Sequence, residues 1–172
     1  MSIDSETDDS TLGVAFVSLL DEESSDADDL LAGVEALIES AGHEVAIHER
    51  IDAAFDAVQA TVSRLADRGD VDAVLVIGGV DVNPDADVPG AVRPLLDAKL
   101  PAFETLFTTH AAETIGTDVL SLRPLGGIMA GVPVFCIPDD DRTVDLAMSE
   151  LICPQLQRLV DLARPDEAEP KT

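Results

Sequence analysis

The sequence VDAVLVIGG at residues 71–79 contains an unbroken run of five aliphatic side chains and ends in Gly78 and Gly79. Such a run, without polar residues at alternate positions, is typical of a strand that other layers cover on both faces. Two glycines directly after it predict a tight turn, because glycine adopts backbone angles that other residues avoid. Residues 71–79 therefore predict a buried strand followed by a glycine turn.

Similar patterns lie on both sides of this strand. Further strands are expected at residues 12–20, 43–49 and 132–138. Helical periodicity is found in residues 28–42, 51–69, 91–98, 101–115 and 141–163. The last of these helices should kink at Pro154, which has no N–H group. Strands that alternate with helices predict an α/β fold with a parallel sheet and right-handed crossovers.

The loops that follow the strands are the places where a ligand is expected. In parallel α/β sheets, ligands bind beyond the carboxyl ends of the strands. These loops are residues 18–28, 78–90 and 138–142.

The chain is strongly acidic. Among its 172 residues, 35 are Asp or Glu and ten are Lys or Arg, which gives a formal net charge of -25. Molar salt screens such a charge within about 3 Å, and salt-adapted proteins use it to stay soluble. We therefore expect a globular protein from a high-salt cytoplasm; the alternative, a disordered acidic chain, is disfavoured by the long aliphatic runs. The same charge argues against nucleic acid and anionic membranes as partners.

One domain is expected, at residues 11–163. It lies between an acidic tail, residues 1–10, and a polar tail, residues 164–172, and both tails are expected to be disordered. No apolar run approaches the roughly 18 residues of a membrane span, and the polar N-terminus does not have the pattern of a secretory signal. Cys136 and Cys153 are isolated and lack the spacing of a metal site. These features favour a cytoplasmic protein.

The order of several motifs carries a family resemblance. They are, along the chain, AGHEV (41–45), VDAVLVIGG (71–79), AVRPLLD (91–97), LPAFETLF (100–107), ETIGT (113–117) and PVFCIPDDD (133–141). In this succession the chain resembles the MoaB/Mog family of molybdenum cofactor biosynthesis proteins over residues 12–162. The resemblance implies a three-layer αβα fold with a mostly parallel sheet and a homo-oligomer, often a trimer. Members of this family bind molybdopterin, and active members transfer adenylate from MgATP to its phosphate.

Two loops depart from the family's motifs near the expected catalytic position. A turn that resembles Thr-Gly-Gly-Thr-Gly in the family becomes residues 77–81, Ile-Gly-Gly-Val-Asp, in this chain. The family's Arg-Asp pair, of which the Asp serves in catalysis, falls on Asp85 and Ala86, with Asp87 adjacent. The resemblance therefore leaves Asp85 and Asp87 as the candidate catalytic carboxylates.

Three other positions are retained only in part. Of a Ser-Arg-Ala motif, Arg123 alone remains, and Asp28 matches an acidic position at the start of the first helix. After Pro138, a Gly-Ser turn is replaced by three aspartates, residues 139–141. A helix N-terminus attracts anions through its unpaired N–H groups, so aspartates there are expected to cap those groups and block a phosphate site.

The resemblance thus assigns a full set of candidate roles. Asp85 and Asp87 are the catalytic candidates, and the substrate-binding candidates are Gly78, Gly79, Arg123, Asp28 and Pro138. The expected ligands are molybdopterin and MgATP. No structural metal is predicted; Asp85, Asp87 or Asp28 could contact the magnesium of MgATP, and the metal ligands stay unassigned.

Each assignment has a structural alternative. The glycine pair could form a tight turn without binding phosphate, and Arg123 could form an ion pair with a nearby acid instead of clamping a phosphate. The loop carboxylates could be surface charge of a salt-adapted protein. The replaced positions also leave open a non-catalytic paralogue that acts as a binding or assembly module.

Nucleophilic hydrolase chemistry is not expected. Ser18 follows the first strand without a Gly-x-Ser-x-Gly elbow. His43, His48 and His110 are scattered along the chain, which predicts surface or packing roles for them.

Overall fold

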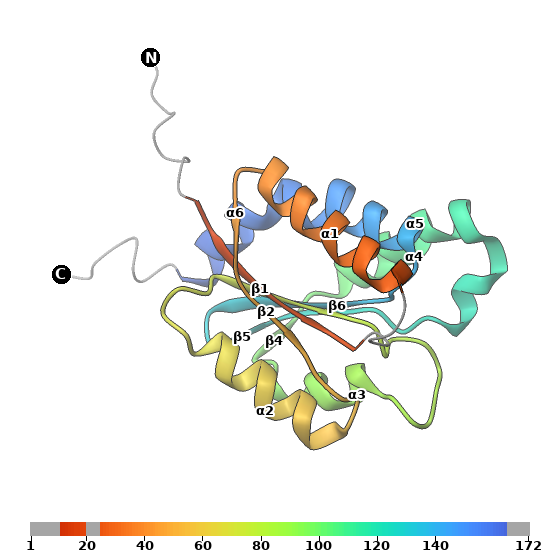
Figure 1. The fold of residues 1–172 in the computed structure, drawn as a ribbon, viewed down its shortest axis with the longest axis horizontal. Coiled ribbons are helices and arrows are strands. Elements are labelled where there is room, and N and C mark those ends of the chain that lie inside the picture. The colour runs from red at the N-terminus through yellow and green to blue at the C-terminus, as the bar shows by residue number, and fades with distance from the viewer. Residues whose placement is uncertain (1–10, 20–24, 165–172) are drawn as a thin grey trace, which may run out of the picture.

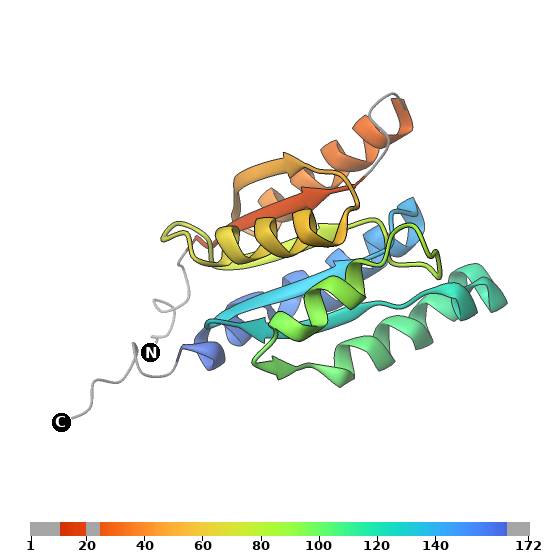
Figure 2. The ribbon, with the colours of Figure 1, turned by 90° about the horizontal axis from the view of Figure 1, so that it is seen from below.

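A computed structural model describes residues 11–19 and 25–164 (Figure 1). Both predicted tails lie outside these ranges, apart from Arg164, the last described residue. The described chain forms three layers, with helices on both faces of one sheet (Figures 1 and 2).

One sheet of six strands forms the middle layer, in the order β2-β1-β3-β6-β5-β4. The strands are β1 (Gly13–Ser18), β2 (Glu44–Arg50), β3 (Ala73–Ile77), β4 (Ala98–Lys99), β5 (Leu125–Met129) and β6 (Val132–Ile137). Strands β2, β1, β3 and β6 run parallel, whereas β5 is antiparallel to both β6 and β4. The prediction of an α/β fold with a mostly parallel sheet is confirmed, and the sheet is mixed at one side.

The helices are divided between the two faces of the sheet. They are α1 (Ser25–Ser40), α2 (Phe55–Ala66), α3 (Val88–Val92), α4 (Pro101–Ile115), α5 (Asp141–Leu146) and α6 (Cys153–Ala163). Short 3-10 helices span Arg93–Leu95 and Gly116–Ser121, and a π-helix spans Ala147–Ile152. Helices α1, α4, α5 and α6 cover one face, and α2 and α3 cover the other (Figure 1).

The alternation of side chains along β3 explains why two helical layers are needed. Leu75 and Ile77 belong to the core under α1, α4 and α6, whereas Val74 and Val76 belong to the core under α2 and α3. All four side chains are buried. A strand with no polar face cannot meet water on either side, so the run at residues 71–79 requires this architecture.

Strands β4 and β5 were not predicted. The helix predicted at residues 91–98 is wrong over most of its length, because α3 ends at Val92, a 3-10 helix spans Arg93–Leu95 and Ala98 begins β4. The sequence of β5 contains two glycines, which strands normally avoid. The structure gives the reason for both glycines of β5. A Cβ atom at Gly126 would lie 3.0 Å from Cδ2 of Phe103 in α4, and one at Gly127 would lie 2.7 Å from the carbonyl oxygen of Ala98. The close packing of β5 against α4 and β4 therefore requires residues without side chains.

Two of the other predicted helices differ from the structure at particular points. The helix expected at residues 51–69 begins only at Phe55, because Ile51 still extends the sheet by donating its N–H to the carbonyl of Ser18 at 3.1 Å. In the helix expected at residues 141–163, a π-helical turn directly precedes Cys153 and Pro154. The wider turn accommodates the proline ring, so helical backbone continues through the site of the expected kink.

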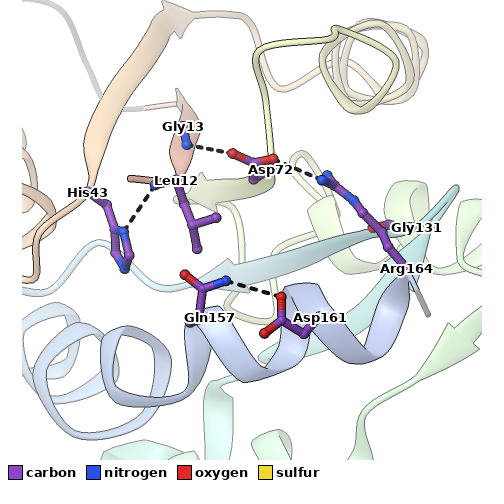
Figure 3. A network of polar contacts seen from close by, with 8 residues as sticks. All are labelled: Leu12, Gly13, His43, Asp72, Gly131, Gln157, Asp161 and Arg164. Carbon is purple, nitrogen blue, oxygen red and sulfur yellow. Dashed lines mark hydrogen bonds and ion pairs between the residues drawn. The ribbon is translucent and has the colours of Figure 1, made fainter. Parts of the chain in front are cut away.

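A polar network joins the chain at the amino edge of the parallel strands (Figure 3). The carboxylate of Asp72 accepts the N–H of Gly13 at 2.8 Å and pairs with Arg164 at 3.0 Å. The guanidinium of Arg164 also donates to the carbonyl of Gly131 at 3.2 Å. This network ties the start of β1, the start of β3 and the β5–β6 turn to the end of α6.

Candidate functional site

The carboxyl edge of the parallel strands brings the predicted loops together. The N–H of Leu19 donates to Ile77 at 3.0 Å, and the N–H of Gly78 donates to Ile137 at 3.0 Å, so the ends of β1, β3 and β6 are adjacent. Helix α1, which follows β1, lies on one face of the sheet, and α3, which follows β3, lies on the other (Figure 1). Strand ends whose connections diverge in this way are the usual ligand site of an open α/β sheet.

The glycine turn after β3 is shaped first by packing. Gly78 and Gly79 have φ angles of 108° and 68°, in the region that favours glycine. A Cβ atom on Gly79 would lie 2.5 Å from Cγ2 of Val88. The N–H of Gly78 already binds Ile137, whereas the N–H of Gly79 donates to no other described residue. Of the two expected phosphate donors, only Gly79 is available for a ligand.

The loop after the turn pairs with the segment that carries Arg123. The carbonyl of Val80 accepts the N–H of Arg123 at 2.8 Å, and the N–H of Val82 donates to Ser121 at 2.9 Å. Asp81 forms an isolated bridge with Leu122 between these two bonds. The backbone pairing therefore fixes Arg123 beside the loop at residues 80–87, as the substrate-binding assignment requires.

The two candidate catalytic carboxylates have different environments. Asp85 is exposed in a turn, where its N–H donates to the side chain of Asn83 at 2.9 Å, and its carboxylate contacts no other described residue. Asp87 caps α3, because its Oδ1 atom accepts the N–H of Gly90 at 2.9 Å. The same Oδ1 atom lies 3.1 Å from Nη2 of Arg123. The sequence predicts a loop to residue 90 and a helix from residue 91, whereas α3 begins at Val88. An N-cap Asp with a proline in the first turn of the helix favours this earlier start.

Asp28 is engaged elsewhere. Its carboxylate, on α1, lies 3.0 Å from the guanidinium of Arg50 at the end of β2. No contact joins Asp28 to Asp85 or Asp87, and within the described ranges no group of three His, Cys, Asp or Glu side chains could hold a metal ion. The structure does not bring the three candidates for magnesium together into one site.

The loop after β6 makes this edge more negative. Pro138 is buried at the end of β6. Asp140 caps α5, with Oδ2 accepting the N–H of Thr143 at 3.2 Å, so one aspartate occupies the helix N–H groups as the sequence implies. Partial desolvation, and then the negative charges of Asp81 and Asp140, raise the pKa of Asp139. Two acidic loops therefore face each other across the ends of β3 and β6.

A groove of about 380 Å³ lies beside this edge, between α1 and α5. Its walls include Leu30, Val34 and Val144, and Asp29 and Asp141 are among its polar residues. Asp141 is the first residue of α5, directly after the loop that follows β6. The carboxyl edge thus combines charged loops with an adjoining, partly apolar groove.

Comparison with known proteins decides the family. Residues 17–158 match a family model described as a probable molybdopterin binding domain. The chain belongs to the MoaB/Mog family of molybdenum cofactor biosynthesis proteins.

Individual relatives agree with this assignment. Molybdenum cofactor biosynthesis protein B of Bacillus subtilis is 34% identical over 134 residues, which cover 77% of this chain and 78% of the relative. The protein of that name from Halalkalibacterium halodurans is 29% identical over 147 residues, covering 85% and 86%. A crystal structure of molybdenum cofactor biosynthesis protein B superimposes with a TM-score of 0.82 at 28% identity, covering 91% of this chain and 98% of that one. The three-layer architecture is therefore that of the MoaB/Mog family.

Sequence reasoning missed one contact at the same edge of this MoaB/Mog family member. The buried Oγ of Ser18 lies 3.1 Å from Nε2 of His48, whose ring stacks on Phe16 at 4.2 Å. Desolvation, and then the positive charge of Arg50, lower the pKa of His48. The contact joins two strands across 30 residues of sequence, so no local pattern could have indicated it. Since Ser18 is fully buried, the pair fixes the end of β1 and does not present a nucleophile.

No helix in the described part of the chain has the length and apolar character that crossing a bilayer needs.

Proposed function

We propose that this chain binds molybdopterin at the carboxyl edge of the sheet and transfers adenylate to it from MgATP. The observation that carries the proposal is the position of Arg123, which backbone pairing holds beside the loop that begins with the free N–H of Gly79. Two donors from separate segments, next to strand ends whose connections diverge, suit a phosphate group. The relatives named as molybdenum cofactor biosynthesis proteins support the same ligand class.

The proposed reaction is a phosphoryl-type transfer. A phosphate oxygen of molybdopterin attacks the α-phosphorus of ATP, a new P–O bond forms, and the bond to the β-phosphate breaks and releases pyrophosphate. Such transfers depend on positioning and on neutralisation of negative charge. Arg123 and the N–H of Gly79 would contact phosphate oxygens. Asp85 and Asp87 remain the candidate catalytic carboxylates, and Asp28 and Pro138 remain candidates at the margin of the ligand.

Magnesium would enter this site with the nucleotide. The carboxylates of the described residues do not assemble into a metal site, and Asp28 and Asp87 are paired with arginines. The unpartnered carboxylate of Asp85 is the one best placed to meet an incoming cation. We assign no step of the reaction to a metal bound by the chain alone.

We also propose that the chain is a homo-oligomer, a trimer by its family, in a salt-rich cytoplasm. A groove of about 430 Å³ lies between α4 and the segment leading into α6, with Leu106, Leu151 and Leu159 among its lining residues. Leu106 is 48% exposed, and Glu150 is the one acid that lines the groove. In a chain of charge -25, a face poor in carboxylates is where copies can meet without repulsion. Light scattering in multimolar KCl tests this, and a monomer at all concentrations would contradict it.

The test of function is direct binding and turnover. Calorimetry in multimolar KCl with Mg²⁺ should show molybdopterin and ATP binding to the chain, and mass spectrometry should detect adenylated molybdopterin. The R123A variant should bind molybdopterin about 10- to 100-fold more weakly, since hydrogen bonds between charged groups contribute about 1.5–3 kcal/mol. R142A is the matched control, because Arg142 is an exposed arginine on neighbouring α5. If wild type binds neither ligand, or if both variants behave like wild type, the proposal is wrong.

A further inference from the structure

The positive charge of Arg123 is already partly neutralised by the chain itself. Nη2 of Arg123 lies 3.1 Å from Oδ1 of Asp87, and the two side chains are 36% and 42% exposed. This is a single-point ion pair, and no other contact of the guanidinium with a described residue exists. A phosphate that binds Arg123 must therefore share it with Asp87 or displace Asp87.

Asp87 is held in place independently of Arg123. Its Oδ1 atom caps α3 by accepting the N–H of Gly90, and the helix continues with Ala91, whose N–H donates to the carbonyl of Asp87 at 3.1 Å. A Cβ atom at Gly90 would lie 2.2 Å from Oδ2 of Asp87, so the carboxylate sits in the space that this glycine leaves open. Moving Asp87 away from Arg123 would cost the cap, which is typically worth about 1 kcal/mol. Moving the Arg123 side chain breaks the ion pair alone among its contacts with described residues, so it costs less than moving Asp87.

The surroundings do not compensate for this neutralisation. Asp81 lies on the same loop as Asp87. Desolvation first, and then the negative charges of Asp81 and Asp140, raise the pKa of Asp139 at the neighbouring strand end. With Arg123 paired, the strand-end loops add three carboxylates, Asp81, Asp139 and Asp140, against one further cation, Arg142, which lies 3.9 Å from Asp140. A free, multiply charged anion is therefore disfavoured at this edge more strongly than a neutral or singly charged group.

We propose that Asp87 is a specificity-determining residue, which competes with the phosphate of the ligand for Arg123 and weakens the binding of multiply charged anions. The inference rests on the proposed function, in which Arg123 contacts a phosphate. It adds a role in ligand selection to Asp87, which stays one of the two candidate catalytic carboxylates. The carboxylate of Asp85, two residues before Asp87, contacts no other described residue and is not part of this competition.

The test compares two variants that remove the same charge from the same loop. D87N keeps an acceptor for the cap, because Asn and Asp cap helices about equally well, but it releases Arg123. D85N removes one charge and leaves the ion pair intact. Binding of inorganic pyrophosphate, measured by calorimetry at several KCl concentrations, should be about two- to fivefold tighter for D87N than for D85N. The difference should shrink as KCl rises, because salt screens half-exposed pairs.

Other outcomes overturn the inference. If D87N binds pyrophosphate no more tightly than D85N, Asp87 does not compete for Arg123. If the double variant D87N/R123A keeps the gain of D87N, the effect does not pass through Arg123. Loss of α3 is checked by the unfolding midpoints of D87N and D87S, because both variants keep a side-chain oxygen that can cap the helix. Midpoints equal to that of wild type show that α3 is intact. Molybdopterin binding by wild type is measured separately, so failure of the competition and failure of the proposed function give different results.

Discussion

Asp72 offers the sharpest test of how this fold is held together (Figure 3). Its carboxylate accepts the N–H of Gly13 at 2.8 Å and pairs with Arg164 at 3.0 Å, with side-chain exposures of 22% for Asp72 and 26% for Arg164. Hydrogen bonds to charged groups contribute about 1.5–3 kcal/mol, and a buried N–H left without a partner costs about 1–3 kcal/mol. We therefore expect D72A to lower the free energy of unfolding by about 3 kcal/mol.

The measurement is thermal and urea unfolding at fixed KCl. For a chain of this size about 1 kcal/mol shifts the midpoint by about 2–4 °C, so D72A should lower it by about 6–12 °C. R164A should cost less, because Asp72 would still accept the N–H of Gly13. The matched control is D70N. Asp70 lies two residues before Asp72 and forms an exposed ion pair with Arg68, so its loss should leave the midpoint unchanged. If D72A and D70N shift the midpoint equally, the network contributes nothing beyond surface charge and the argument fails.

Three further outcomes are expected. Nδ1 of His43 accepts the N–H of Leu12 at 3.2 Å, and desolvation lowers the pKa of His43 against a smaller opposing effect of Asp72. The fold therefore favours the neutral ring. The stabilisation from His43 is complete above about pH 6.5 and is lost as the pH falls through the lower pKa that His43 has in the folded state. Unfolding of wild type and of H43Q across that pH range tests this, and only wild type should lose this stabilisation. G79A should lower the free energy of unfolding by about 1–3 kcal/mol, because its Cβ would lie 2.5 Å from Val88 at a φ of 68°, and an unchanged urea midpoint would contradict this. Burial raises the pKa of the Cys136 thiol, so thiol reagents should label it only after denaturation.

The parts of the fold that were predictable are those with local causes. The strand at residues 71–79 is apolar on both faces because both faces are covered, and the cap at Asp140 follows from an aspartate three residues before the N–H that it accepts. Strand β5 was not predictable, because its glycines have their reason in Phe103 and Ala98, which are distant in sequence. Strand propensity describes the preference of a single residue type. It carries no information about a residue distant in sequence that packs where a side chain would lie.

In the candidate site, too, the features with local causes were predictable and those that depend on distant residues were not. The sequence placed Gly78, Gly79 and Arg123 at one edge, and the structure brings their segments together. The sequence could not indicate that Asp87 pairs with Arg123, because this contact depends on the pairing of residues 80–82 with residues 121–123. Nor could it indicate that Asp28 pairs with Arg50 at the end of β2 and so lies apart from Asp85.

The way in which arginines are paired separates Arg123 from Arg64 and Arg164. Arg64 binds Glu49 through two nitrogens, at 2.9 and 2.7 Å, and Arg164 binds both Asp72 and the carbonyl of Gly131. Such two-point contacts use the planar fork of the guanidinium fully and leave little to offer a ligand. Arg123 makes one contact at 3.1 Å, and its remaining donors have no partner among the described residues. In a chain with 35 acids, finding an arginine paired says little about its function. A single-point pair at a strand-end edge is what an exchangeable phosphate contact requires, and Arg123 shares this pattern with Arg50, which pairs with Asp28 at 3.0 Å. Of these two, only Arg123 is also held by backbone pairing beside the loop that follows the glycine turn.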